Sequence, residues 1–239
     1  MADQVRVRTL FTTRRTGASV PPYDEANLGD HVGDDPAAVR INRIALETRL
    51  GAPIVWMDQV HGNDVAVVDA ARVTAVPGVD ALVTTQPNIG LGVLVADCVP
   101  VLLADANANI VAAAHVGRRG LVAGTAARAV DAMRERGAPP VRIEAWLGPA
   151  ICGKCYEVPA AMQAEVEAAA PGSAVRTRAG TPGVELRAAL RRQLHGVGVS
   201  TIHDVGPCTA ESTEHYSFRR DGVTGRFAGV IVLASRDAG

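Results

Sequence analysis

Short apolar runs dominate the middle of the chain and predict buried strands. The runs are rich in Val, Leu and Ile, and each is bounded by Asp, Asn, Gly or Pro, which is typical of strands buried in a core. They cover residues 65–69, 81–85, 91–96, 99–104 and 110–115. The polar segment 105–109 (DANAN) predicts a turn between the last two strands.

Helices are predicted on both sides of this strand-rich region. Asp35 followed by Pro36 is typical of an N-cap and a first helical residue, so we expect a helix over residues 36–50. A second helix is expected after a Gly-rich turn, because apolar residues recur at helical spacing from Leu121 until Gly137. The last third adds predicted strands over 142–147, 202–205 and 227–233 and predicted helices over 159–169 and 185–194.

The order of these elements indicates the fold class. Strands and helices are interspersed without strict strand–helix–strand alternation, which favours an α+β fold with a mixed or antiparallel sheet over a doubly wound one. No internal repeat or low-complexity linker divides the 239 residues. We therefore expect one domain over residues 1–239.

Composition narrows the classes of partner. The formal net charge is −1 and aromatic residues make up 3%, which argues against a nucleic-acid binder. No apolar stretch reaches membrane length, and no apolar segment follows Arg14 and Arg15 as a secretory signal would require. The sequence predicts a cytoplasmic protein without membrane partners and leaves its oligomeric state open.

Three residues at the ends of apolar runs are candidates for chemistry: His61, Cys98 and His115. Their spacing is not that of a zinc finger, but imidazole and thiolate ligands suit a tetrahedral zinc ion with a fourth position open to water. Two other interpretations stay open from the residues alone. All three can be ordinary core residues, or Cys98 can act as a metal-free nucleophile with His115 as its base.

The remaining cysteines are less informative. Four cysteines in a cytosolic chain suggest metal or thiol chemistry more than a disulfide framework. Cys152 and Cys155 form a C-x-x-C motif, but no second C-x-x-C accompanies it, so a zinc ribbon is not predicted. A redox pair and two incidental thiols both remain open.

Several segments, in order from about residue 11 to 233, resemble the YfiH-type family. That family is also called multicopper polyphenol oxidoreductase laccase and, in some lineages, peptidoglycan editing factor. The resemblance is carried by NLGDHVGDDPAAVRINR (27–43), QVHG (59–62), DALVTTQP (80–87), ADCVPVLLAD (96–105), AAAHVGRRG (112–120), LGP (147–149), YEV (156–158), CT (208–209), YSFRRDG (216–222) and TGR (224–226). It implies layers ordered α/β/β/α and a zinc site formed by His61, Cys98 and His115.

The chain departs from the family pattern at two places. The usual HAGWRG motif is replaced by HVGRRG, so Arg118 stands where the family has a Trp beside the site. The N-terminal GGVS-like element is replaced by Gly-Ala-Ser-Val at 17–20. The first change alters the expected pocket wall and its charge, and the second leaves the role of that loop open.

The resemblance implies phosphorolysis of adenosine, inosine and methylthioadenosine, with adenosine deamination as a side activity. The metal site would be catalytic. Arg119, before a helix, and the neighbouring Arg219 and Arg220 are candidates for binding phosphate. Asn27 and Arg43 either hydrogen-bond the substrate or fix loops. The usual zinc-deaminase signature is absent from the chain.

Three alternatives remain, two of them suggested by the family's other names. One is a hydrolase or amidase for peptidoglycan precursors with Cys98 as its nucleophile, and another is a zinc-stabilised binding protein without enzymatic activity. The third is a copper-dependent polyphenol oxidase. A four-copper oxidase needs more imidazoles than the six histidines of this chain offer, although one copper ion can occupy the same site as zinc.

Overall fold

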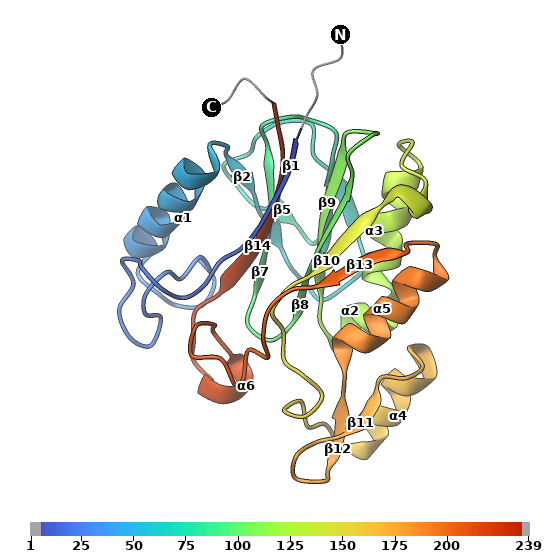
Figure 1. Cartoon of the computed structure of the whole chain (residues 1–239). Coiled ribbons are helices and arrows are strands. Elements are labelled where there is room, and N and C mark those ends of the chain that lie inside the picture. Colours follow the sequence, from blue (N-terminus) through green and yellow to red (C-terminus); the bar gives the residue numbers. More distant parts are fainter. Residues whose placement is uncertain (1–5, 236–239) are drawn as a thin grey trace.

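Two β-sheets pack face to face at the centre of the protein, as the computed structural model of residues 6–235 shows (Figure 1). The smaller sheet has the order β1 (Arg6–Phe11), β14 (Phe227–Ala234), β7 (Gly90–Val95) and β2 (Ile54–Val55). The larger sheet has the order β13 (Thr201–Asp204), β10 (Glu144–Leu147), β8 (Val99–Asp105), β9 (Ile110–Val116), β6 (Ala81–Thr84) and β4 (Val65–Val67). Most neighbours are antiparallel, but β2–β7, β10–β13 and β4–β6 are parallel, which confirms the predicted mixed sheet.

Helices cover the outer faces of both sheets. The smaller sheet carries α1 (Pro36–Leu50), whereas α2 (Arg118–Ala123), α3 (Thr125–Arg134) and α5 (Leu186–Gly196) lie on the larger one (Figure 1). An outer extension holds α4 (Ala160–Ala169), β11 (Ala174–Arg176) and β12 (Pro182–Val184). The short elements are β3 (Met57–Asp58), β5 (Val76–Pro77), the 3₁₀ turn Pro140–Arg142 and α6 (Phe218–Asp221). The expected α/β/β/α layers are therefore confirmed.

Three apolar cores separate these layers and explain the uninterrupted apolar runs. In β9, Val111 and Ala113 belong to the core between the sheets, while Ala112 and Ala114 belong to the core under the helices. A strand buried on both faces has no polar side to show, so its sequence reads as apolar throughout.

Two predicted elements are corrected by the structure. The helix expected between Leu121 and Gly137 is two helices, because Gly124 adopts φ +74° and ends α2 before α3 begins at Thr125. The strand expected over 142–147 begins at Glu144, because the residues before it form the 3₁₀ turn. The helix predicted over 36–50 is confirmed, with the Asp35 carboxylate accepting from the Ala37 N–H.

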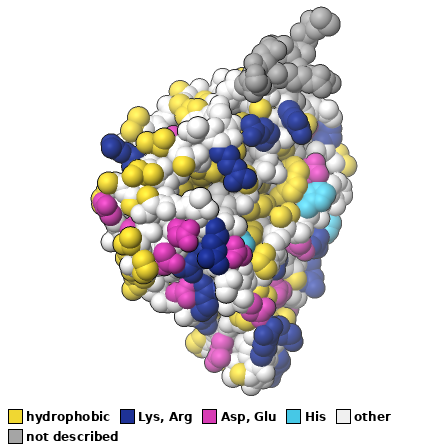
Figure 2. Space-filling model, turned by 60° about the vertical axis from the view of Figure 1, so that its left-hand side comes forward, with side chains coloured by type: hydrophobic (Ala, Val, Ile, Leu, Met, Phe, Trp, Pro, Cys, Tyr) yellow, Lys and Arg dark blue, Asp and Glu magenta, His cyan; other side chains and the backbone are white. Residues whose placement is uncertain are grey.

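The surface shows no single sign of charge on the face drawn in Figure 2, where acidic and basic side chains are interspersed among apolar ones. None of the helices in residues 6–235 is both long and apolar enough to span a bilayer.

Candidate metal centre

Three chain segments bring His61, Cys98 and His115 together, and we call this group the His/Cys/His site. His61 lies in the loop after β3, Cys98 in the bend between β7 and β8, and His115 is the penultimate residue of β9. Antiparallel pairing of β8 with β9 sets Pro100 opposite His115 and thereby brings Cys98 beside it. One donor atom from each of the three residues lies within 4.8 Å of the others, and Cys98 Sγ is 3.9 Å from His61 Nε2.

A buried carboxylate orients both histidines. Asp80, directly before β6, is fully buried, and its Oδ1 lies 2.8 Å from His115 Nδ1. The same carboxylate accepts the backbone N–H groups of Val60, His61 and Gly62 at 2.6–3.2 Å. Because His115 Nδ1 is engaged by Asp80, Nε2 is its nitrogen available to a metal. Asp80 therefore fixes one imidazole ring directly and the other through its backbone.

Electrostatics favour the thiolate at this position. Burial raises the pKa of Cys98, but the charge of His115 and hydrogen bonds from His115 and His61 outweigh it and lower this pKa to about 6. Burial lowers the pKa of His115, yet Cys98 and Asp80 raise it to about 9. Both shifts favour the ion pair of a Cys98 thiolate with a His115 imidazolium. A thiolate is the form of cysteine that binds metals and attacks electrophiles.

The backbone around the site is strained and closely packed. His61 and Asp97 both have positive φ, +61° and +98°, which is uncommon for residues with side chains. The Asp97 carboxylate holds its own turn by accepting from Thr209 Oγ1 at 2.7 Å and from the Arg219 N–H at 2.6 Å. Gly117 leaves room for the sulfur, since a Cβ there would lie 2.7 Å from Cys98 Sγ.

The His/Cys/His site opens into a cavity of about 910 Å³. The size matches that of a small-molecule site. Its apolar lining includes Met57, Leu94, Ile151, Leu186 and Phe218. The cavity therefore combines a metal-binding corner with apolar walls.

Three arginines share the lining with these groups: Arg118, Arg219 and Arg226. The Arg219 guanidinium lies over the Tyr156 ring, 5.0 Å from its centroid, and donates to the Glu157 carbonyl at 2.7 Å. Arg226 Nη1 donates to two carbonyls of its own turn, and Arg118 Nη1 is 3.7 Å from a Glu165 carboxylate oxygen. Each guanidinium has further N–H groups that these contacts do not use.

The structure places only one of the residues predicted to bind substrate in the cavity lining. Arg219 lines the cavity, whereas Asn27, Arg43, Arg119 and Arg220 do not. Asn27 is fully buried and fixes loops, its Oδ1 accepting from the Arg226 N–H at 2.8 Å. Arg43 donates to the Leu28 carbonyl and stacks on a Trp ring, and Arg119 is exposed on α2.

Two contributors were missed by the sequence interpretation, Asp80 and Arg226. Both stand in the segments that carry the family resemblance, DALVTTQP and TGR. A charged residue directly before a fully buried strand was the available signal for Asp80. Arg226 gave no local signal, because its position in the cavity depends on the contact of its loop with Asn27.

Comparison with known proteins places nearly all of the described chain in one family. The family model described as multi-copper polyphenol oxidoreductase laccase matches residues 8–234. A Mycobacterium tuberculosis protein named purine nucleoside phosphorylase is 54% identical over 231 residues, 95% of this chain and 92% of the relative. A Streptomyces coelicolor protein of the same name is 52% identical over 227 residues, 93% of this chain and 94% of the relative.

Solved structures share the fold over nearly the full length. The YlmD protein of Geobacillus stearothermophilus superposes with a TM-score of 0.89 at 34% identity, covering 98% of this chain and 94% of that one. Protein NMB0706 of Neisseria meningitidis gives a TM-score of 0.87 at 36% identity, covering 98% and 96%.

Proposed function

The chain belongs to the multi-copper polyphenol oxidoreductase laccase family, and from this premise we propose that it is a metal-dependent purine nucleoside phosphorylase. The observation that carries the proposal is the presence of the His/Cys/His site and three arginines on the wall of one cavity. The names of relatives that match nine-tenths of the chain support the same reaction.

The residues present fit a zinc ion. Two imidazoles and a thiolate are a ligand set that zinc accepts, and a carboxylate behind a ligating histidine is the usual support for it. Three protein ligands facing a cavity are typical of catalytic sites, while structural zinc sites have four. When bound, the metal supplies Lewis-acid stabilisation of developing negative charge. Copper would also accept this ligand set.

The arginines provide the positive charge that is needed to bind phosphate, the second substrate. In phosphorolysis a phosphate oxygen bonds to the ribose C1′ while the bond from C1′ to the purine breaks. Phosphate must therefore be held as an anion next to the sugar, which bidentate guanidinium groups do well. Arg219 and Arg226 take this role in our proposal, with Arg118 as a third positive group. Arg119 was another phosphate ligand predicted from the sequence. It is exposed on α2 and lies outside the cavity, so we propose the cavity arginines in its place.

The apolar walls suit the purine. Leu94, Ile151, Leu186 and Phe218 offer apolar surfaces to an aromatic base. We propose adenosine, inosine and methylthioadenosine as substrates, the nucleosides that the resemblance to the YfiH-type family implies. Adenosine deamination is proposed as a side activity of the same site.

A second candidate function is favoured by one geometric feature. Cys98, His115 and Asp80 follow one another as nucleophile, base and orienting carboxylate, the order of groups in cysteine hydrolases. In that case the chain is a metal-independent hydrolase or amidase. Activity that survives complete removal of metal would favour this candidate over the phosphorylase.

Product analysis tests the proposal. Purified protein is incubated with each nucleoside, with and without phosphate, and the products are identified by mass. We expect free base and ribose 1-phosphate only when phosphate is present. Arg119→Met serves as the matched control for Arg219→Met, since the first arginine lies outside the cavity and the second inside it. Free ribose formed without phosphate would refute phosphorolysis, and inosine as the sole product from adenosine would indicate a deaminase.

A further inference from the structure

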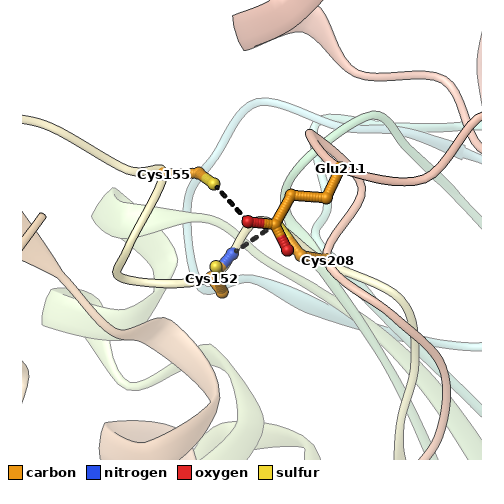
Figure 3. A group of neighbouring side chains, drawn as sticks. All are labelled: Cys152, Cys155, Cys208 and Glu211. Atoms are coloured by element: carbon orange, nitrogen blue, oxygen red, sulfur yellow. Dashed lines mark hydrogen bonds between the residues drawn. The ribbon is translucent and has the colours of Figure 1, made fainter. Parts of the chain in front are cut away.

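A second group of metal-binding side chains lies outside the cavity lining. Cys152, Cys155, Cys208 and Glu211 each place one donor atom within 4.8 Å of the others, and we call them the turn cluster (Figure 3). None of the three cysteines is in a disulfide. The C-x-x-C motif seen in the sequence is therefore completed by two residues more than fifty positions further along the chain.

Two turns of the same hydrogen-bonding pattern form the turn cluster. In the first, the N–H groups of Cys155 and Tyr156 both donate to the Cys152 carbonyl at 2.9 Å. In the second, the N–H groups of Glu211 and Ser212 donate to the Cys208 carbonyl at 3.2 and 3.0 Å. Each turn thus carries its two donor side chains at positions i and i+3. The pair amounts to C-x-x-C facing C-x-x-E, a pattern that a search for a second C-x-x-C cannot find.

Backbone contacts hold the two turns together. The Thr209 N–H donates to the Ala150 carbonyl at 3.1 Å, and residues 150 and 208 form an isolated parallel bridge. The Cys152 N–H donates to Cys208 Sγ at 3.3 Å, and Cys155 Sγ donates to Glu211 Oε1 at 3.2 Å (Figure 3). An N–H directed at a sulfur stabilises the thiolate form that a metal requires.

We propose that the turn cluster binds a zinc ion in a structural site. Three thiolates and one carboxylate give the four ligands of a closed tetrahedral zinc site, and this number separates it from the three-ligand His/Cys/His site. Binding releases the thiol protons, including the one that Cys155 shares with Glu211. Arg178, which forms an ion pair with Glu211, offsets part of the negative charge of the ligands.

The bound zinc would brace one wall of the cavity. Tyr156 directly follows Cys155 and lines the cavity. Asp97, the neighbour of Cys98, accepts from the Ile151 N–H at 2.9 Å and from Thr209 Oγ1 at 2.7 Å, one contact to each turn segment. A metal that ties the two segments together would therefore keep this wall in place, and its binding free energy would add to folding stability.

Metal content of single variants tests this inference and does not depend on the proposed activity. Protein purified without chelators should contain about two zinc ions per chain, and both Cys98→Ala and Cys155→Ser about one. Cobalt replacing zinc in Cys98→Ala should give intense thiolate-to-metal charge-transfer absorption, because three thiolates remain at the turn cluster. The same treatment of Cys98→Ala carrying Cys155→Ser as well should lose most of that absorption.

Two further variants keep the test decisive if Cys155→Ser does not fold. Glu211→Gln should release zinc to a chromogenic chelator faster than the wild type does, while Glu214→Gln, an exposed carboxylate on the same loop, should not. Glu211→Cys should slow the release by completing four thiolates. Equal zinc content in wild type and Cys155→Ser would overturn the proposal. So would a Cys152–Cys155 or Cys152–Cys208 disulfide found by mass in alkylated, unreduced protein.

Discussion

The His/Cys/His site and the turn cluster use similar ligands in very different settings. The first is built on the sheets: His115 is buried in β9 and backed by the fully buried Asp80, and the site faces a cavity. The second is built on two turns at one end of the larger sheet, and none of its four side chains lines the cavity. Three ligands beside a cavity leave a position for chemistry, whereas four ligands close the coordination shell.

The setting also decides what each metal would do for the fold. Strand register fixes the first site, so the sheets would stay folded without a metal. The two turns are joined by few backbone bonds, so a metal would contribute much of what holds them. We expect metal loss to abolish activity at the first site and to lower thermal stability at the second. The predictions below test this division.

The largest effect among the supporting residues is expected at the cavity arginines. Arg226→Met removes a cation proposed to hold phosphate, and loss of such a contact costs on the order of a hundredfold in turnover. Nucleoside affinity should change much less, because the lost contact is to the other substrate. Steady-state kinetics with varied phosphate measures this, with Arg119→Met as control. A turnover within a few-fold of the wild type would remove Arg226 from the phosphate site.

A smaller effect is expected from changing Asp80, the carboxylate that supports the metal ligands. Asp80→Asn removes the carboxylate that orients His115 and the His61 turn, and changes to such supporting groups typically cost about 10- to 100-fold in metal affinity or activity. Competition with a chromogenic chelator measures the affinity. Asp69→Asn, at an exposed aspartate, provides the comparison. Unchanged zinc affinity in Asp80→Asn would show that strand register alone positions the histidines.

Steric crowding at the His/Cys/His site should have a more modest cost. In Gly117→Ala the new methyl group would lie 2.7 Å from Cys98 Sγ, so the sulfur must move. Overpacking of this kind costs about 1–3 kcal/mol, which corresponds to roughly tenfold or more in zinc affinity. Gly196→Ala is a matched control, because nothing lies near its added Cβ. Equal zinc affinity in both variants would contradict the described packing.

The smallest expected effect lies in the outer extension near the turn cluster. Backbone N–H groups of Gly172 and Ala174 donate to Glu167 and lower its pKa. Because the folded-state pKa is lowered, Glu167 stabilises the fold above its unfolded pKa of about 4.3, and this stabilisation is lost as pH falls through the folded value. Urea unfolding of Glu167→Gln should therefore differ from the wild type at neutral pH and converge with it in acid. A difference that persists in acid would contradict this role.

The sequence predicted the fold better than it predicted the cavity. Most central strands and α1 were found because burial on both faces and an Asp-Pro helix start leave strong local patterns. Gly124 was missed as a helix break, because one glycine within a periodic segment does not reveal its φ. β1 was missed because half of its residues are exposed and Arg6 and Arg8 interrupt its apolar pattern.

The two groups of metal-binding side chains also show how far the sequence alone predicts a site. His61, Cys98 and His115 were selected by strand ends and by family resemblance, and the structure brings them together. The turn cluster was not predicted, because Cys208 and Glu211 meet Cys152 only through the pairing of two distant turns. Asn27 was predicted either to bind substrate or to fix loops, and its side-chain oxygen accepts from the backbone N–H of Arg226.

The rate of hypoxanthine release from inosine, measured against phosphate concentration, tests the central claim most directly. Wild type, Cys98→Ala and Cys155→Ser are compared at a temperature where all three are folded. We predict a rate that rises and saturates with phosphate in the wild type, no release above background in Cys98→Ala, and most of the wild-type rate in Cys155→Ser. Release without phosphate, or release by Cys98→Ala, would contradict the account.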